Sequence, residues 1–148
     1  TNILLGLENW ISEGKPLLGI CLGLQLLFES SSEGHLPGLG FLKGHVKQLP
    51  KEPEERVPHM GWCLLNRKKE CPLLDSHQKI SNWMYFVHSY SAIPSDKNDL
   101  AATVTFGSKE LTALVWKNNI GACQFHPEKS GIAGNKLLIN WTNWVSKF

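Results

Sequence analysis

Cys21 is the residue of this sequence whose surroundings best suit covalent chemistry. It follows the apolar run of residues 17–20 and stands between two glycines, in the pattern Gly19-x-Cys21-x-Gly23. This is the cysteine form of the nucleophile elbow, a sharp strand-to-helix turn that lifts a nucleophile above a sheet. Glycine on both sides leaves room for the turn, and the N-terminus of the following helix favours the reactive thiolate. A buried cysteine after a core strand gives the same pattern, so both interpretations stay open here.

His126 and Glu128 are the two further groups that a cysteine nucleophile needs. They follow a predicted strand at residues 120–125, and Pro127 lies between them. The base must take and return a proton, and a third group must hold its tautomer. Because residues two apart in an extended segment point the same way, we expect the Glu128 carboxylate beside the His126 ring. His-Pro-Glu alone is typical of a solvated loop, but with the elbow it predicts a Cys–His–Glu triad.

The elements around Cys21 follow from hydrophobic spacing. Apolar residues at helical spacing predict a first helix that ends near Gly14, and residues 17–20 predict a buried strand. The elbow helix is expected from Leu22 to about Ser31. A loop rich in glycine and proline then leads to a strand at residues 45–48.

The second half of the sequence predicts strands closed by a helix. Residues 51–56 are charged and contain a proline, which indicates an exposed turn. Strands are expected at residues 83–92, 101–106 and 111–116. The apolar stripe of a final helix is formed by Leu137, Leu138, Trp141, Val145 and Phe148. The sequence therefore predicts an α/β domain whose site lies where the strands of Cys21 and His126 end.

Composition narrows the function classes. The 148 residues suffice for one domain with a core, and a formal charge of +2 does not indicate a basic surface for nucleic acid. No apolar run has membrane-spanning length, and we expect no membrane partner. The four cysteines lack CxxC pairs, and we expect free thiols in the cytoplasm. A metal site at His59, Cys63, Cys71 and His77 is disfavoured by their spacing, so neither a metal nor a cofactor is expected.

Several sequence blocks resemble a known family. Gly-Ile-Cys21-Leu-Gly-Leu-Gln and Gln-Phe-His126-Pro-Glu-Lys are similar to the class I (triad-type) glutamine amidotransferases. The blocks at residues 26–31, 57–62, 85–90 and 128–130 most closely resemble the glutaminase subunits of imidazole glycerol phosphate synthase, in histidine biosynthesis. The resemblance implies the flavodoxin-like fold of that family, a mixed central sheet flanked by helices, and hydrolysis of L-glutamine to glutamate and ammonia.

The resemblance also implies roles for individual residues. Cys21 attacks the amide carbon, His126 transfers protons, Glu128 orients His126, and the backbone N–H of Leu22 stabilises the oxyanion. The amino-acid end of glutamine is expected at Gln25, Glu33, Ser89 and Tyr90. Gln25 is the stronger of the side-chain assignments, because a glutamate such as Glu33 near a helix end is typically solvated.

A second subunit is implied as well. In the family it is a (β/α)8-barrel cyclase that docks on the glutaminase as a heterodimer and carries the ammonia to its acceptor. The segments that match its docking face contain Met60, Trp62, Tyr85, His88 and Lys129. Met60, Trp62 and Tyr85 also suit an ordinary core or rim. This sequence departs from the family at Cys63, where asparagine is usual, and we expect an altered polar contact there.

The start of the sequence differs from the family pattern. Residue 1 is threonine, and the chain opens directly on a helix, whereas the family begins with strands and a glycine-rich loop that gives the oxyanion its second N–H. We therefore expect one glutamine amidotransferase domain over residues 1–148 that is incomplete at its N-terminus, and a weaker oxyanion site.

Three alternatives remain open at this point. A paralogous amidotransferase could supply ammonia for sugar amination in surface-polysaccharide pathways, with the same triad and a different partner. The chain could act only as a binding module. A cysteine hydrolase or peptidase of a related α/β fold could carry the same elbow, although the blocks around Tyr85 and His126 argue against it.

Overall fold

The computed structural model describes residues 2–74 and 82–148. The helices are α1 (Asn2–Ser12), α2 (Leu22–Leu26) and α3 (Gly131–Val145), with 3₁₀ turns η1 (Lys97–Asp99) and η2 (Pro127–Lys129). The strands are β1 (Leu17–Ile20), β2 (Ser30–Ser31), β3 (Gly44–Gln48), β4 (His59–Arg67), β5 (Trp83–His88), β6 (Tyr90–Pro94), β7 (Leu100–Phe106), β8 (Lys109–Lys117) and β9 (Ile120–Cys123).

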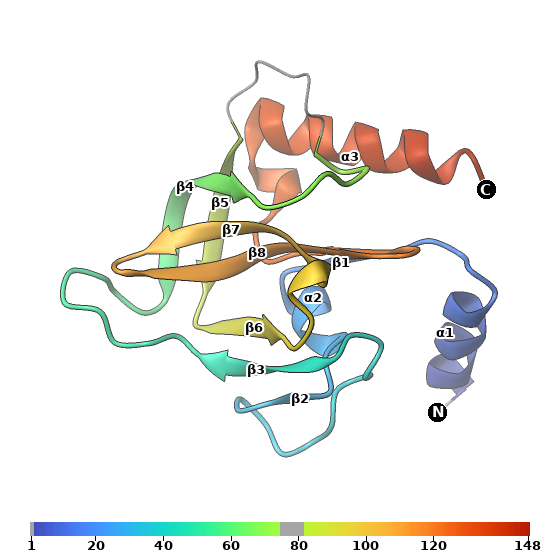
Figure 1. Cartoon of the computed structure of the whole chain (residues 1–148), viewed down its shortest axis with the longest axis horizontal. Coiled ribbons are helices and arrows are strands. Elements are labelled where there is room, and N and C mark those ends of the chain that lie inside the picture. Colours follow the sequence, from blue (N-terminus) through green and yellow to red (C-terminus); the bar gives the residue numbers. More distant parts are fainter. Residues whose placement is uncertain (1, 75–81) are drawn as a thin grey trace.

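The strands of the described residues form two sheets. The larger sheet has the order β1-β9-β8-β7-β4-β5, in which β1 and β9 are parallel and the other neighbours are antiparallel. The smaller sheet has the order β2-β3-β6. Figure 1 shows α3 on one side of the larger sheet and the smaller sheet on the other. The predicted α/β class with a mixed central sheet is confirmed.

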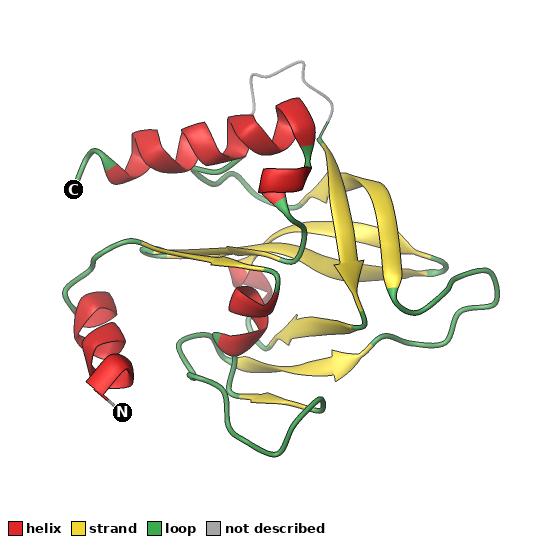
Figure 2. Cartoon of the chain, turned by 180° about the vertical axis from the view of Figure 1, so that it is seen from behind, coloured by secondary structure: helices red, strands yellow, loops and turns green. Residues whose placement is uncertain are grey.

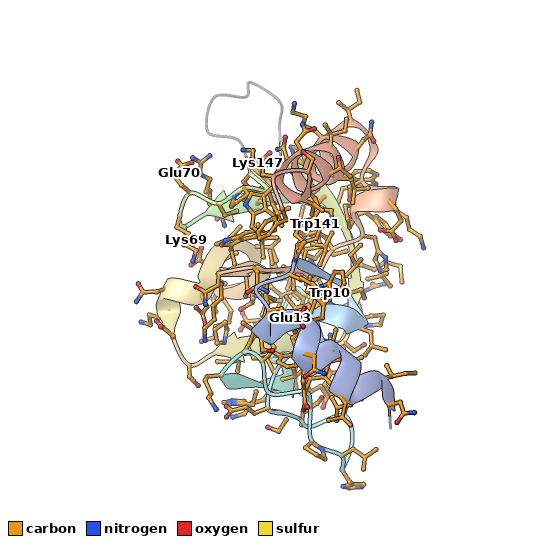
Figure 3. The ribbon with its side chains drawn as sticks, turned by 90° about the vertical axis from the view of Figure 1, so that its right-hand side faces the viewer. Trp10, Glu13, Lys69, Glu70, Trp141 and Lys147 are labelled. Atoms are coloured by element: carbon orange, nitrogen blue, oxygen red, sulfur yellow. The ribbon has the colours of Figure 1, made fainter. Side chains whose placement is uncertain are left out.

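The core lies on both sides of the larger sheet. Leu137 of α3 is 2% exposed, and Trp144 stacks edge-on against Trp116 of β8 at 4.8 Å between ring centroids. Trp141, labelled in Figure 3, points from α3 toward the same sheet. The other face buries Leu24 of α2 together with residues of β3 and β9. In Figure 2, α2 lies between the end of the larger sheet and the smaller sheet. The site residues around α2 are therefore held by both sheets.

The predicted first helix is confirmed as α1, but none of its residues is buried. Trp10 donates a hydrogen bond to the Pro16 carbonyl at 2.9 Å, and Ile3 is 83% exposed. No helix of the described ranges is long and apolar enough to cross a membrane.

The elbow helix is shorter than the sequence predicted. It ends at Leu26, and Ser30–Ser31 is a strand that pairs parallel with β3. The carbonyls of Leu26 and Phe28 accept hydrogen bonds from Leu39 and Gly40, at 2.8 and 3.1 Å, instead of continuing the helical ladder. The expectation of helix to Ser31 is therefore wrong because the loop after it supplies competing backbone donors.

Three other expectations need correction. The strand expected at residues 83–92 is two strands, β5 and β6, which leave Ser89 between them and join different sheets. Strand β4 was not predicted, because His59-Met-Gly-Trp lacks a clear alternation of polar and apolar residues. Phe148 lies beyond the end of α3. The strands expected at 45–48, 101–106 and 111–116 are confirmed as β3, β7 and β8.

Candidate active site

Cys21 occupies a strained turn between β1 and α2. Its backbone has φ 53° and ψ −107°, a conformation that non-glycine residues rarely adopt. The Cys21 N–H donates to the Cys123 carbonyl at 2.8 Å, and the Cys21 carbonyl accepts from Leu24 at 3.1 Å. The turn is therefore fixed on one side by β9 and on the other by α2, as expected for a nucleophile elbow.

Only one of the two flanking glycines is required by close contacts. A Cβ on Gly19 would lie 2.9 Å from the carbonyl carbon and oxygen of Gly23. A Cβ on Gly23 would meet nothing within 4 Å, and its φ is not in the left-handed region. The prediction that both positions exclude a side chain is therefore right for Gly19 and wrong for Gly23.

The parallel pairing of β1 with β9 brings the three candidate catalytic residues to one sheet edge. Ile20 is paired with Cys123, so Cys21 and the segment that leads to His126 leave the sheet side by side at their carboxyl ends. His126 is held by its N–H, which donates to the Tyr85 carbonyl at 2.9 Å. Ser130 Oγ donates to the His126 carbonyl at 2.6 Å.

His126 and Glu128 are in direct contact. Nδ1 of His126 lies 2.7 Å from Oε1 of Glu128, and the two side chains are 18% and 48% exposed. The contact was predicted, but for an extended segment; Pro127–Lys129 is a 3₁₀ turn instead. Burial raises the pKa of Glu128, but the hydrogen bond with His126, a backbone hydrogen bond and the charges of His126 and Lys129 outweigh it. The pKa of Glu128 therefore lies below its ordinary value, and the carboxylate is ionised.

The thiol of Cys21 is not activated by the turn alone. Burial raises its pKa above the ordinary value, while hydrogen bonds from the Leu22 N–H and from Gln124 act in the opposite direction. The charge of Glu128 raises this pKa further and that of Lys129 lowers it. The helix N-terminus favours the thiolate as expected, through the Leu22 N–H, but burial outweighs it and the pKa of Cys21 is raised overall. A base is needed to take the proton from Cys21.

Gln124 was not predicted as a site residue, but its side chain links Gln25 to Cys21. It is fully buried, its Oε1 accepts from Gln25 Nε2 at 3.1 Å, and its own Nε2 lies 3.8 Å from Cys21 Sγ. Gln25 Nε2 also donates to the Tyr90 carbonyl at 3.1 Å. A glutamine inside the apolar run before His126 was the signal that could have identified it, because a buried amide needs partners.

A pocket of about 380 Å³ lies next to the turn, and Leu22, the residue after Cys21, forms part of its wall. Its wall includes Leu22, Gln25 and Glu33, and its size suits a small molecule. Glu33 is exposed. Ser89 and Tyr90 do not line this pocket: both are half-buried, and their carbonyls accept hydrogen bonds from Leu49 and from Gln25, respectively.

The residues expected at a docking face separate into two groups. Met60 and Trp62 on β4 are 61% and 51% exposed, and Trp62 stacks edge-on with Tyr85 of β5 at 5.8 Å. Lys129 is exposed on η2, beside Glu128. His88, in contrast, is only 6% exposed, so its placement on an outer face is wrong. It faces inward because alternate residues of β5 are buried, and it belongs to that buried set.

No group of three or more acidic, histidine or cysteine side chains in the described ranges has the arrangement of a metal site. His59 and Cys63 contact each other, with 3.3 Å between Nε2 and Sγ. His77, the fourth residue considered for a metal site, lies outside the described residues.

Comparison with known proteins agrees with this arrangement. A family profile described as "Glutamine amidotransferase class-I" matches residues 3–143. The chain is 62% identical to the imidazole glycerol phosphate synthase subunit HisH of Prochlorococcus marinus strain MIT 9211, over 98% of this chain and 68% of that protein. It is 55% identical to the protein of the same name from Synechococcus sp. strain CC9605, with the same coverage of 98% and 68%.

Solved structures share the fold at lower identity. PurLQS from Thermotoga maritima matches with a TM-score of 0.72 and 21% identity, over 97% of this chain and 68% of that one. A crystal structure described as a glutamine amidotransferase matches with a TM-score of 0.67 and 19% identity, over 99% and 69%. The family profile and the close relatives together establish that this chain belongs to the class I glutamine amidotransferases.

Proposed function

We propose that this chain is the glutaminase subunit of imidazole glycerol phosphate synthase and hydrolyses L-glutamine to glutamate and ammonia for histidine biosynthesis. The names of its close relatives support this function. The observation that carries the chemistry is the parallel pairing of β1 and β9, since Cys21 and the His126–Glu128 pair leave the sheet at the same edge.

The first half of the reaction forms a thioester. His126 takes the proton of Cys21, because burial keeps that thiol protonated at rest. The thiolate attacks the side-chain amide carbon of glutamine, and the carbonyl oxygen becomes an oxyanion. His126 then gives its proton to the departing nitrogen, the C–N bond breaks, and ammonia leaves a glutamyl thioester on Cys21.

The second half returns the enzyme to its starting state. His126 takes a proton from water, the hydroxide adds to the thioester carbon, and the C–S bond breaks to release glutamate. His126 returns the proton to Cys21. The ionised Glu128 holds the His126 tautomer through the 2.7 Å contact at Nδ1 and stabilises the imidazolium that forms in each half.

The Leu22 backbone N–H is the proposed oxyanion donor. The Leu22 N–H lowers the pKa of Cys21, which supports this role, because a donor that stabilises the thiolate also lies close to the carbonyl oxygen of the amide that the sulfur attacks. Loss of one oxyanion donor typically costs about a hundred- to a thousand-fold in rate.

Glutamine is proposed to bind in the pocket along α2. Gln25 and Glu33 line it, and Glu33 is the residue available for the substrate ammonium group. Gln25 donates to Tyr90 and Gln124, so we assign it a positioning role in the wall. Neither Ser89 nor Tyr90 lines this pocket, so the Tyr90 carbonyl acts on the substrate only through Gln25.

The proposed partner is a (β/α)8-barrel cyclase that receives the ammonia in a cytoplasmic heterodimer. Met60 and Trp62 are the docking anchors, since they are exposed and Trp62 is braced by Tyr85. Lys129 extends this surface from η2, next to the triad residue Glu128. A docking face beside the triad gives ammonia a short path that avoids bulk water.

The test is glutamate release from L-glutamine by this chain mixed with a barrel cyclase from a close relative and the cyclase ligand. The Cys21→Ala variant is the control, and complex formation is measured in parallel by size-exclusion chromatography. Glutamate release that is lost in Cys21→Ala supports the proposal. Complex formation without release contradicts the glutaminase role, and release without complex formation contradicts the cyclase as partner.

A further inference from the structure

Two buried histidines form a contact that the proposed mechanism does not use. His59 of β4 and His88 of β5 are paired directly across the strands, and each is 6% exposed. Nδ1 of His59 lies 2.9 Å from Nε2 of His88. The His59 ring also packs against Phe86 and Phe106, at 5.3 and 5.2 Å between centroids. Because the surroundings are apolar, each ring nitrogen of the two histidines needs a hydrogen-bond partner.

The direction of these hydrogen bonds follows from one carbonyl. His88 Nδ1 lies 2.8 Å from the Tyr90 carbonyl oxygen, which can only accept, so Nδ1 carries the proton. Nε2 of neutral His88 must then accept, which makes His59 Nδ1 the donor to it. His59 Nε2 is left as an acceptor, and the Cys63 thiol, 3.3 Å away, donates to it.

The same carbonyl connects this chain of donors to the active site. The Tyr90 oxygen also accepts from Gln25 Nε2 at 3.1 Å, and that amide donates its second proton to Gln124 Oε1 at 3.1 Å. Gln124 Nε2 lies 3.8 Å from Cys21 Sγ. Every step from Cys63 to Cys21 is thus a hydrogen-bond contact between described side chains, with one shared backbone oxygen.

We propose that Cys63, His59 and His88 form a relay of neutral, fixed tautomers that positions the Tyr90 carbonyl, and through it Gln25 and Gln124, beside Cys21. The proposal rests on the glutaminase function proposed above. It makes the three residues positioning residues, because none of them touches the reacting atoms.

Burial favours the neutral form of the relay. Burial lowers the pKa of His88 to about 4, with a further lowering from His59 and an opposing effect of the Tyr90 carbonyl. Burial also lowers the pKa of His59, and the Glu55 carboxylate opposes this only in part. Burial and the Glu55 charge both raise the pKa of Cys63, so its thiol keeps the proton that it donates.

Such a relay transmits a change at Cys63 through the position of the rings and not through their tautomers. Without the thiol proton, His59 Nε2 is an unpaired buried acceptor, while the Tyr90 carbonyl still requires a protonated Nδ1 on His88. His59 Nδ1 therefore remains the donor to His88 Nε2, but the His59 ring has lost the contact that fixes its other nitrogen. The His88 donor to the Tyr90 carbonyl is then held less firmly, although no residue near Cys21 has been altered.

The first test measures the tautomers directly, without any enzyme activity. Long-range ¹H–¹⁵N correlation spectra of ¹⁵N-histidine-labelled chain at neutral pH distinguish protonated from unprotonated ring nitrogens. We expect protonated Nδ1 and unprotonated Nε2 in both His59 and His88. Cys63→Ala is expected to keep these tautomers but to shift the Nε2 resonance of His59, which loses its donor, whereas Cys63→Ser, which keeps an O–H donor, is expected to leave that resonance close to its wild-type position. Protonated Nε2 in either ring of the wild type overturns the proposal.

The second test is kinetic and uses the chain assembled with the cyclase. Cys63→Ala is expected to raise the KM for glutamine on the order of fivefold to tenfold, the value of one net hydrogen bond, with a smaller effect on kcat. Cys63→Ser should restore most of this loss. Cys71→Ala removes a thiol from another half-buried site and is expected to leave both constants unchanged. Equal kinetics of Cys63→Ala and Cys71→Ala overturn the proposal.

The His88 position gives an independent comparison. The amide nitrogen of an asparagine can stand where Nδ1 stands, so His88→Asn keeps the donor to Tyr90, whereas His88→Leu removes it. We expect a lower KM for glutamine in His88→Asn than in His88→Leu, with both chains checked for folding by circular dichroism. If the wild-type assembly releases no glutamate, the proposed function fails, and the tautomer spectra still decide on the relay.

Discussion

Nδ1 of His126 and Oε1 of Glu128 lie 2.7 Å apart. The 3₁₀ turn Pro127–Lys129 follows His126 directly, so the conformation of this short segment decides how the histidine ring is oriented. Pro127 stands at the start of this turn and is buried. The local turn therefore sets the contact between the two side chains, while the hydrogen bond from the His126 N–H to the Tyr85 carbonyl ties the turn to β5.

Replacing Glu128 by glutamine should impair catalysis without unfolding the chain. The amide keeps the size of the side chain but removes the charge that stabilises the His126 imidazolium. Because the carboxylate is 48% exposed, we expect a loss of glutamine hydrolysis on the order of a hundredfold, less than the roughly ten-thousandfold of a buried triad acid. Steady-state glutamate release measures it, and activity within about twofold of wild type would show that Glu128 has no part in the triad.

Alkylation of Cys21 should require high pH. Since burial raises the pKa of this thiol, its iodoacetamide reaction rate in the isolated chain is expected to keep increasing above pH of about 8.5, the ordinary cysteine pKa. Peptide mass spectrometry separates Cys21 from the other three thiols. A rate that levels off near neutral pH would mean that the thiolate is already formed at rest.

The two glycines of the elbow should respond differently to alanine. Gly19→Ala places a Cβ 2.9 Å from backbone atoms of Gly23, and we expect a loss of about 1–3 kcal/mol in unfolding free energy. Gly23→Ala meets open space inside α2, and a gain of up to about 1 kcal/mol is expected. Urea unfolding of both variants provides the comparison. Equal destabilisation would contradict the geometry of the turn.

Stability should fall on mild acidification because of His88. Its folded pKa of about 4 lies below the ordinary value of 6.5, so between these values the unfolded chain binds a proton that the folded chain does not. Above pH 6.5 titration of this histidine does not affect the free energy of unfolding. As the pH falls from 6.5 to about 4, the free energy of unfolding decreases by up to about 3 kcal/mol.

Urea unfolding at several pH values in this window measures the effect. His88→Asn, which cannot titrate, is expected to show a shallower pH dependence than wild type. Parallel curves for the two proteins would assign the acid sensitivity to other groups.

Local sequence patterns predicted much of the fold. Helical spacing identified α1, and apolar runs identified β1, β7 and β8. The break at Ser89 could not be predicted, because the residues on both sides suit a strand and only their partners differ: β5 pairs with β4, and β6 pairs with β3.

The site was predictable to the extent that its chemistry is local. Cys21, His126 and Glu128 follow from residue types and neighbours in the sequence. The contact of Gln25 with Gln124 joins residues 99 positions apart, and it depends on the register of β1 and β9. The inward direction of His88 depends in the same way on the register of β5. Alternation shows which residues of a strand share a face, but not which of the two faces is turned toward the core.

The backbone of Cys21, with φ 53° and ψ −107°, has an evolutionary consequence. Glycine adopts this conformation at little cost, whereas a residue with a side chain gives up about 1–3 kcal/mol. Selection for a durable fold alone would thus replace Cys21 with glycine. We expect a cysteine to be kept at this position only while selection for its reactivity is stronger than selection for stability. A lineage that no longer used the reaction would be expected to lose this residue early.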